Sequence, residues 1–156
     1  MIPDYNRYYG CVFVQLLEQR PKLVVEKMSV DVQGFYLLER SLPLYVKFSR
    51  SRRGPWGFNF QAEHQFRCDE LAKQFGTVVT ALVCGADGIV ALDHQQLREV
   101  LDSHFDDQEG VTVRRKLGQM YSVTGKDGKL ARKISRDSLA VVVDGLLAPR
   151  AAAPIA

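Results

Sequence analysis

The spacing of apolar residues switches between helical and alternating along the chain, which predicts a mixed α/β domain. The sequence opens with a stripe of apolar residues at helical spacing that Pro21 ends, and three segments with extended patterns follow it. In chain order, the expected helix and three expected strands are residues 5–20, 22–32, 35–39 and 44–48. A strand competes for residues 11–14, where four apolar side chains are consecutive.

The middle of the chain predicts a helix between two strands. Residues 61–75 carry apolar side chains at helical spacing, and Gly76 is expected to close this helix as a C-terminal cap. Aromatic residues alternate over residues 56–60, which predicts a short strand leading into the helix. The nearly continuous apolar run of residues 77–84 is typical of a central strand covered on both faces. After a glycine-rich turn, residues 89–92 are expected to return as its neighbour.

The last part of the chain predicts another helix and then short strands. Asp93 is expected to cap the helix, with Gln96 in the position of a capping box. Three short strands are expected after it, at residues 111–115, 120–124 and 129–134, and residues 125–128 form a hairpin turn between the last two. Residues 138–147 fit either a strand or a short helix.

These elements predict one α/β domain over residues 1–147 and a flexible tail, rich in Ala and Pro, over residues 148–156. The expected fold has a central mixed sheet with helices on its faces and a small β-rich C-terminal extension. A chain of 156 residues with 46% hydrophobic and 25% charged residues is typical of one globular domain. Without an apolar run of membrane length or a signal-peptide pattern, we expect a cytoplasmic protein that does not enter a membrane.

Positive charge is concentrated in residues 44–60. This segment contains four basic residues and no acidic residue, so its charge is +4. The net charge of the chain is +3, so the remaining residues sum to −1. Arginine side chains bind phosphates and aromatic faces stack on bases, so the segment is a candidate nucleic-acid contact, with DNA as the expected partner. The candidate residues, with a second basic cluster that could extend the same surface, are Arg50, Arg52, Arg53, Trp56, Arg114 and Arg115. A solvated basic loop over a buried Trp, and a contact for an acidic protein partner, are the alternatives.

The order helix, three strands, helix, strand, with Lys47 in the third strand, allows a family comparison. The run Leu-Tyr-Val-Lys-Phe-Ser at residues 44–49 resembles the lysine strand of the PD-(D/E)xK nuclease superfamily, which includes restriction enzymes and Holliday-junction resolvases. The run at residues 56–60, followed by a helix and an apolar strand, is similar to small resolvase-like members. The resemblance covers about residues 5–84, and it implies a restriction-endonuclease-like core with the order α-β-β-β-α-β.

The resemblance also implies a catalytic site. In such nucleases carboxylates hold a divalent cation, usually Mg²⁺, and a lysine stands near the attacking water. It assigns Lys47 to the lysine and Asp31, 16 positions earlier, to the first metal ligand. The position two before the lysine holds Tyr45 instead of an acid, so the second carboxylate would be Glu39, with Glu18 and Glu26 as substitutes. Alternatively, Lys47 is a solvent-facing strand lysine and the carboxylates are ordinary surface groups.

Other chemistries find little support in the sequence. His64 and Cys68 are four apart on an expected helix, but no further His or Cys has a spacing that completes a zinc site. No Ser-His-Asp arrangement or P-loop is present. Two hypotheses remain: nucleic-acid binding on a nuclease-like scaffold, with metal-dependent cleavage as an open option, or a small bacterial-type accessory protein without catalysis. The second would bind a protein partner or a second copy of the chain, through the basic surface or the edge at residues 89–92.

Overall fold

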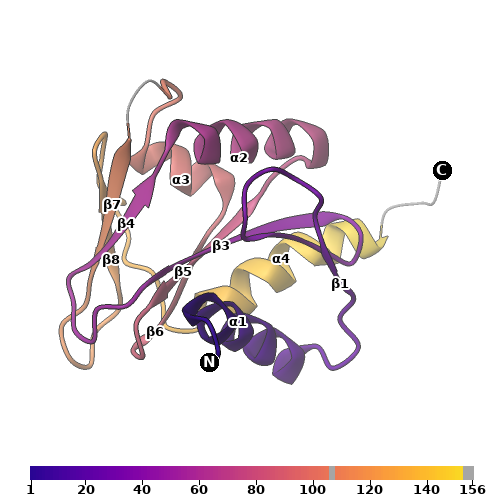
Figure 1. Cartoon of the computed structure of the whole chain (residues 1–156), viewed down its shortest axis with the longest axis horizontal. Coiled ribbons are helices and arrows are strands. Elements are labelled where there is room, and N and C mark those ends of the chain that lie inside the picture. Colours follow the sequence, from indigo (N-terminus) through magenta and orange to yellow (C-terminus); the bar gives the residue numbers. More distant parts are fainter. Residues whose placement is uncertain (106–107, 153–156) are drawn as a thin grey trace.

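A five-stranded mixed sheet forms the centre of the computed structural model, which describes residues 1–105 and 108–152. Its strand order is β1-β2-β3-β5-β6; β3 and β5 run parallel, and the other neighbours are antiparallel (Figure 1). The bounds are β1 Val25–Lys27, β2 Phe35–Leu38, β3 Leu42–Ser49, β5 Val79–Cys84 and β6 Gly88–Leu92. Every residue of β5 is buried, as its apolar sequence predicts for a central strand.

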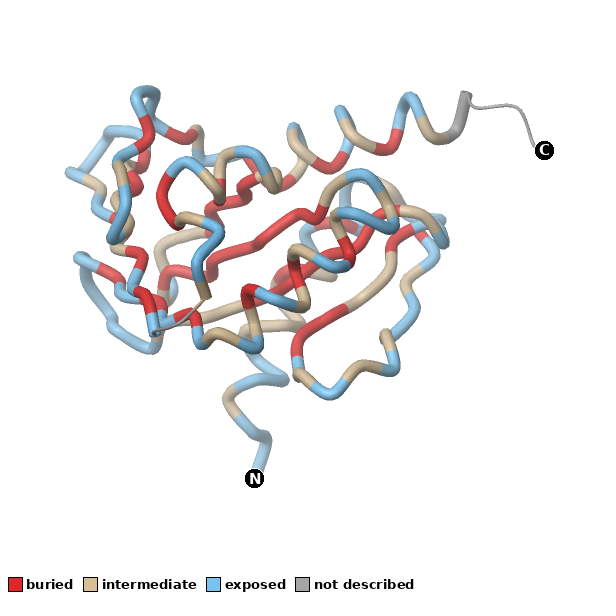
Figure 2. The backbone as a smooth tube through the Cα atoms, turned by 90° about the horizontal axis from the view of Figure 1, so that it is seen from above, coloured by how far each residue is buried: buried red, intermediate tan, exposed pale blue. Residues whose placement is uncertain are grey.

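Four helices flank this sheet, so the predicted central mixed sheet with helices on its faces is confirmed. Helices α1 (Asp4–Gln19) and α4 (Ser138–Ala152) cover one face, and α2 (Ala62–Phe75) and α3 (His94–Val100) lie on the other (Figure 1). Alternate residues of β3 and β5 enter two separate apolar cores, one on each face. The buried tube segments in Figure 2 accordingly run along the central strands and along the inner sides of the helices.

A second sheet of three strands packs beside α2 and α3. Its order is β4 (Trp56–Phe60), β7 (Glu109–Arg114) and β8 (Ser122–Gly125), all antiparallel. The predicted β-rich C-terminal extension is therefore incomplete without β4, which comes from the middle of the chain and pairs with β7. The aromatic residues of β4 are buried and its two intervening residues are exposed, in agreement with the predicted alternation.

Local capping signals predict the ends of two helices correctly. Asp93 accepts a hydrogen bond from the backbone N–H of Gln96, and the Gln96 side chain accepts one from the Asp93 N–H, which completes the predicted capping box of α3. Gly76 ends α2 in the left-handed conformation, at φ 91°. Gln61 and His64 form a capping box at the start of α2 that the sequence analysis did not predict.

Three predicted segments differ in the structure. Residues 22–32 form a strand only at Val25–Lys27, and residues 129–134 make two isolated bridges to the β8 region instead of a strand. Residues 138–147, predicted as strand or helix, are helical, and α4 continues to Ala152 where a flexible tail was predicted. The helix persists because the Arg150 guanidinium donates to the backbone oxygens of Ser41 (3.0 Å) and Phe75 (2.7 Å). The remainder of the predicted tail, 153–156, lies outside the described residues. Among the described helices, none combines the length and the apolar character that crossing a bilayer requires.

Candidate functional site

Lys47 lies on the face of β3 that α2 covers, beside Tyr45, as the strand alternation predicts. Its Nζ is 3.4 Å from the Tyr45 hydroxyl oxygen and 3.5 Å from Nδ1 of His64 on α2. The same ammonium group lies 4.9 Å from the centre of the Phe60 ring. Helix α2 and strands β3 and β4 therefore surround this lysine with aromatic groups.

The contacts of His64 indicate its protonation state. Its Nδ1 accepts from the backbone N–H of Gln61 at 3.4 Å and also faces Lys47 Nζ. Both neighbours are donors, so Nδ1 carries no proton and the hydrogen of a neutral ring lies on Nε2. Burial, and then the charge of Lys47, lower the pKa of His64, which favours this neutral form.

The charge of Lys47 is also perturbed by its surroundings. Burial lowers the pKa of Lys47 from its ordinary value to about 8, because the ammonium group has lost much of its water. Burial raises the pKa of Tyr45, so its phenol stays neutral. Within the described part of the chain, Lys47 has no salt bridge. A partly buried cation without a counter-charge is an uncommon arrangement in a folded protein.

We call the space beside this cation the lysine hollow. It has a volume of about 400 Å³, and its lining is formed by Tyr9, Val32, Gln33, Tyr45, Val46, Lys47, Phe48, Gly57, Phe58, Asn59 and His64. None of these lining residues is acidic. Protein sites for Mg²⁺ use carboxylate ligands, and the lining of the lysine hollow supplies none. The residues present therefore do not fit the divalent cation that the resemblance implies.

The predicted metal ligands are engaged elsewhere. Asp31 accepts from Nη2 of Arg67 at 2.7 Å, and this hydrogen bond lowers the pKa of its carboxyl group. Glu39 accepts from the backbone N–H of Val24 at 3.0 Å and lies at the turn between β2 and β3. Lys47 stands five residues beyond the start of β3, which corresponds to about 16 Å of extended chain. The structure thus does not bring Glu39 to Lys47 and holds Asp31 in an ion pair.

The two substitute carboxylates are also placed away from Lys47. Glu26 lies on β1, at the far edge of the sheet, with its Oε1 3.3 Å from Nε of Arg40. Glu18 lines a separate hollow between α1 and the start of α4. Neither therefore supplies the second metal ligand that the resemblance implies.

Three acidic residues do meet at a different place in the fold. Oxygen atoms of Asp102, Glu109 and Asp127 lie within 4.8 Å of one another, where the end of α3, the start of β7 and the turn after β8 come together. The Glu109 carboxyl accepts from Gln65 Nε2 at 2.6 Å, and Asp127 accepts from the backbone N–H of Asp102 at 2.9 Å. Burial raises the pKa of Glu109, while the Asp102 N–H lowers that of Asp127. The two shifts are opposite, so the neutral form is favoured at Glu109 and the ionised form at Asp127.

Basic residues from separate segments meet at the opposite end of β7. Because Trp56 pairs with Val113, the loop before β4 lies beside the chain that leaves β7. A hollow of about 570 Å³ forms between them, and five of its lining residues are exposed cations: Arg53, Arg114, Lys116, Lys129 and Lys133. We call this surface the basic hollow, and none of the described residues that line it is acidic. One residue of the loop cluster, Arg53, thus meets Arg114 and Lys116 of the second cluster at one surface.

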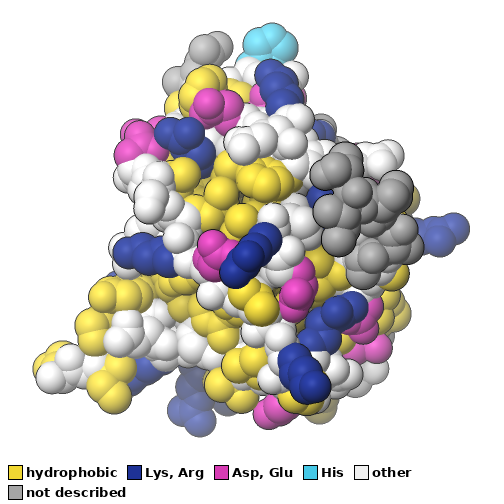
Figure 3. Space-filling model, turned by 90° about the vertical axis from the view of Figure 1, so that its right-hand side faces the viewer, with side chains coloured by type: hydrophobic (Ala, Val, Ile, Leu, Met, Phe, Trp, Pro, Cys, Tyr) yellow, Lys and Arg dark blue, Asp and Glu magenta, His cyan; other side chains and the backbone are white. Residues whose placement is uncertain are grey.

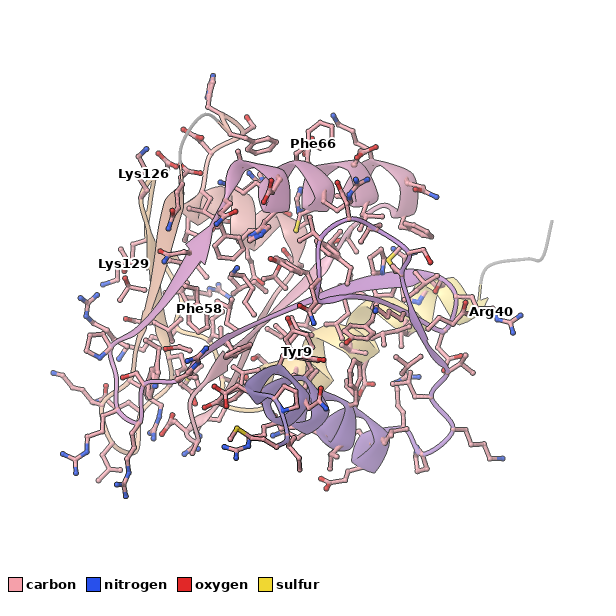
Figure 4. All side chains as sticks on the ribbon, viewed as in Figure 1. Tyr9, Arg40, Phe58, Phe66, Lys126 and Lys129 are labelled. Carbon is pink, nitrogen blue, oxygen red and sulfur yellow. The ribbon has the colours of Figure 1, made fainter. Side chains whose placement is uncertain are left out.

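Lys129 and Lys133 were not predicted as part of this surface. They follow the hairpin turn after β8, and Lys133 Nζ donates to Gln119 Oε1 at 2.9 Å. Figure 4 labels Lys129 on the side of the molecule where the second sheet lies. Nothing in the spacing of these lysines points to Arg53, so the sequence contained no usable signal for them.

Two of the predicted nucleic-acid contacts have little exposed surface and are engaged within the fold. Trp56 is 3% exposed, and its Nε1 donates to the backbone oxygen of Ser51 at 3.0 Å, so its ring is not free to stack on a base. The Arg115 side chain is 7% exposed and binds both carboxylate oxygens of Asp87, at 2.8 and 2.7 Å. Tyr121 also donates to Asp87, at 2.6 Å. The sequence signal for the burial of Trp56 was the alternation of aromatic residues along β4, which places Trp56 on the buried face of the strand.

The other two loop arginines lie outside the basic hollow. Arg50 approaches Asp4 with its Nε at 3.0 Å, and Arg52 is exposed. On the face that contains the end of α4, basic and acidic side chains are interspersed among hydrophobic ones (Figure 3). A larger hollow of about 690 Å³, lined partly by Arg20, Glu39 and Arg150, has mixed charge. The basic hollow thus gathers five cations without an acidic lining residue, whereas this larger hollow and the face in Figure 3 carry charges of both signs.

Comparison with known proteins identifies one similar solved structure. It is a Holliday junction resolvase of Archaeoglobus fulgidus, an archaeal hyperthermophile, with 12% sequence identity and a TM-score of 0.44. The similarity covers 66% of this chain and 85% of the resolvase chain. No protein-family model and no curated protein matches the sequence.

Proposed function

We propose that the protein binds nucleic acid through the basic hollow. The observation that carries the proposal is the convergence of five exposed cations, from the loop before β4, the end of β7 and the segment after β8, around one hollow without an acidic lining residue. Such a surface attracts polyanions because cations replace the counterions that otherwise condense on phosphates. Arg53 and Arg114 also offer guanidinium groups, which bind phosphate through two parallel hydrogen bonds.

The remaining lining of the basic hollow supports an extended ligand. Pro55 and Met120 are exposed apolar residues between the cations, so the sugar and base parts of a nucleic acid would have apolar surface to contact. Arg52 is exposed in the same loop and adds a further cation. By contrast, the face shown in Figure 3 carries charges of both signs.

Binding, and not metal-dependent cleavage, is the function that the residues support. The lysine hollow has no acidic lining residue, and Asp31 and Glu39 bind Arg67 and the Val24 N–H instead. A metal-dependent nuclease requires carboxylates that hold the metal ion beside the attacking water. We therefore propose a nucleic-acid-binding protein on a nuclease-like scaffold, with no divalent metal at Lys47.

The test is a salt series of binding to a short duplex and to a single strand of the same sequence. If all five cations meet phosphates, log K falls against log salt concentration with a slope of about −4.5 for duplex DNA and about −3.5 for a single strand. The double variant Arg53→Ala/Arg114→Ala should reduce the duplex slope by about 1.8 and weaken binding to all sequences. Arg40→Ala is the matched control, since Arg40 is exposed and lies away from Lys129 (Figure 4).

Two results would contradict the proposal. The first is no binding to either nucleic acid at low salt. The second is binding whose salt slope is the same in the double variant and in Arg40→Ala. The first result favours the alternative, a protein-interaction role without a nucleic-acid partner, and the second places nucleic-acid binding outside the basic hollow.

A further inference from the structure

The Lys47 side chain carries a positive charge that the described residues do not balance. The groups that face its Nζ are the Tyr45 phenol from β3 and the His64 ring and Cys68 thiol from α2, all of which are neutral. Helix α1 contributes Tyr9, also a neutral phenol, to the same hollow. A cation in partly buried surroundings is costly unless an anion accompanies it.

The polar side chains around the lysine hollow can all donate hydrogen bonds. Lys47 supplies an ammonium group, Tyr9 a hydroxyl, Gln33 and Asn59 supply amide N–H groups, and the neutral His64 ring has its hydrogen on Nε2. Gly57 has open space at the position of a side chain, so nothing on β4 fills the hollow there. A cation and uncharged groups that can donate, with no carboxylate in the lining, favour an anionic ligand over a metal cation.

We propose that the lysine hollow binds a phosphate group directly, without a divalent metal. A phosphate dianion supplies the missing counter-charge and has enough oxygen atoms to accept from Lys47 and from several of the surrounding donors at once. The volume of about 400 Å³ is within the range of small-molecule sites, about 300–1,000 Å³, so the hollow has room for a phosphate monoester.

Two sources of the phosphate are compatible with the fold. Strand β4 connects the two hollows, since Pro55 lines the basic hollow just before it and Gly57 and Asn59 line the lysine hollow. The terminal phosphate of a nucleic acid and a free phosphate or small phosphate ester both present the required chemistry. The site itself does not depend on the proposed function, because inorganic phosphate needs no contact with the basic hollow.

Phosphate binding should be coupled to the protonation of Lys47. The pKa of Lys47 is about 8 without a ligand, and a bound dianion favours the ammonium form, so the pKa is higher in the complex. Binding therefore takes up protons near pH 8, and the affinity for phosphate falls as the pH rises above that value. The neutral groups of Tyr45 and Cys68 do not compete for this proton, because burial raises both of their pKa values.

The test is a titration of the whole protein with inorganic phosphate, followed by NMR signals of the Lys47 ammonium and the His64 ring and by calorimetry at pH 7 and pH 9. We expect shifts localised at these two residues, tighter binding at pH 7, and an affinity at least about tenfold lower in Lys47→Gln. The exposed Lys27→Gln is the matched control and should bind phosphate as the wild type does. A parallel titration with Mg²⁺ should leave both signals unchanged.

Each opposite result overturns the proposal. The first is that phosphate does not shift the NMR signals of Lys47 and His64 in the wild type, or shifts those of other residues instead. The second is an unchanged phosphate affinity in Lys47→Gln, and the third is a shift of the two signals by Mg²⁺. Because the wild-type titration needs no variant, misfolding of Lys47→Gln does not remove the test. A second comparison uses one oligonucleotide with either a 5′-phosphate or a 5′-hydroxyl end. If the wild type prefers the 5′-phosphate and Lys47→Gln abolishes this preference, the source is the end of a nucleic acid. If the wild type shows no preference, the source is a free phosphate or small phosphate ester.

Discussion

Replacing Lys47 with Met should stabilise the protein at neutral pH. The folded chain holds the pKa of Lys47 near 8, compared with an ordinary value of 10.5, because burial disfavours the ammonium form. At about 1.36 kcal/mol per pH unit, this gap corresponds to about 3 kcal/mol. Some of the penalty is relieved by residual solvent, so we expect the free energy of unfolding of Lys47→Met to exceed that of the wild type by about 2–3 kcal/mol at pH 7. Met has a similar length and fills the aromatic surroundings without a charge.

The pH dependence follows from the sign of the shift. Below about pH 8 both the folded and the unfolded chain hold the proton on Lys47, so the whole penalty is present. Between about pH 8 and 10.5 the unfolded chain binds the proton more strongly, and the stability of the wild type therefore rises with pH relative to that of the variant. The advantage of Lys47→Met should be complete below pH 8 and should disappear as the pH approaches 10.5.

The assay is urea unfolding of both proteins from pH 6.5 to 10.5. Taking the difference between them cancels the titration of the other tyrosines, cysteines and lysines. Lys27→Met, at an exposed position on β1, is the control and should differ little from the wild type throughout. The reasoning is refuted if Lys47→Met is less stable than the wild type at pH 7, or if the difference does not change with pH.

Two further predictions concern Trp56, which is buried, and Asp87, which accepts hydrogen bonds from Arg115 and Tyr121. Trp56 is the single Trp and is 3% exposed, so iodide should quench its fluorescence weakly and saturating nucleic acid should leave its emission unchanged; strong quenching by either would place its ring in the binding surface. The hydrogen bonds from Arg115 and Tyr121 hold the pKa of Asp87 at about 2, so the stability that its carboxylate supplies is present above about pH 4 and is lost as the pH falls toward 2. Asp87→Asn should therefore be less stable than the wild type at pH 7 but lose less stability on acidification, as measured by urea unfolding at pH 7 and pH 3, and parallel losses would contradict the assignment.

The elements that the sequence predicts well depend on neighbouring residues. The capping box of α3 and the end of α2 at Gly76 involve groups only a few positions apart, so their signals survive in any tertiary context. The burial of β5 on both faces follows from its apolar run. By contrast, residues 129–134 have the composition of a strand but only isolated bridges, because strand formation requires a neighbour along its whole length.

The sequence by itself determined the mixed sheet, the flanking helices and the concentration of positive charge in residues 44–60. It also determined the side of β3 on which Lys47 lies, since strand alternation is a local property. Only the tertiary structure decided what these residues meet. The pairing of β4 with β7 joins Arg53 to Arg114, buries Trp56, and creates the basic hollow. The packing of α2 over β3 places His64 3.5 Å from Lys47 Nζ. Among the described residues, Lys47 forms no salt bridge with a carboxylate. The chemistry of a charged group depends on its neighbours in space, and those neighbours come from segments whose separation along the chain conceals their contact.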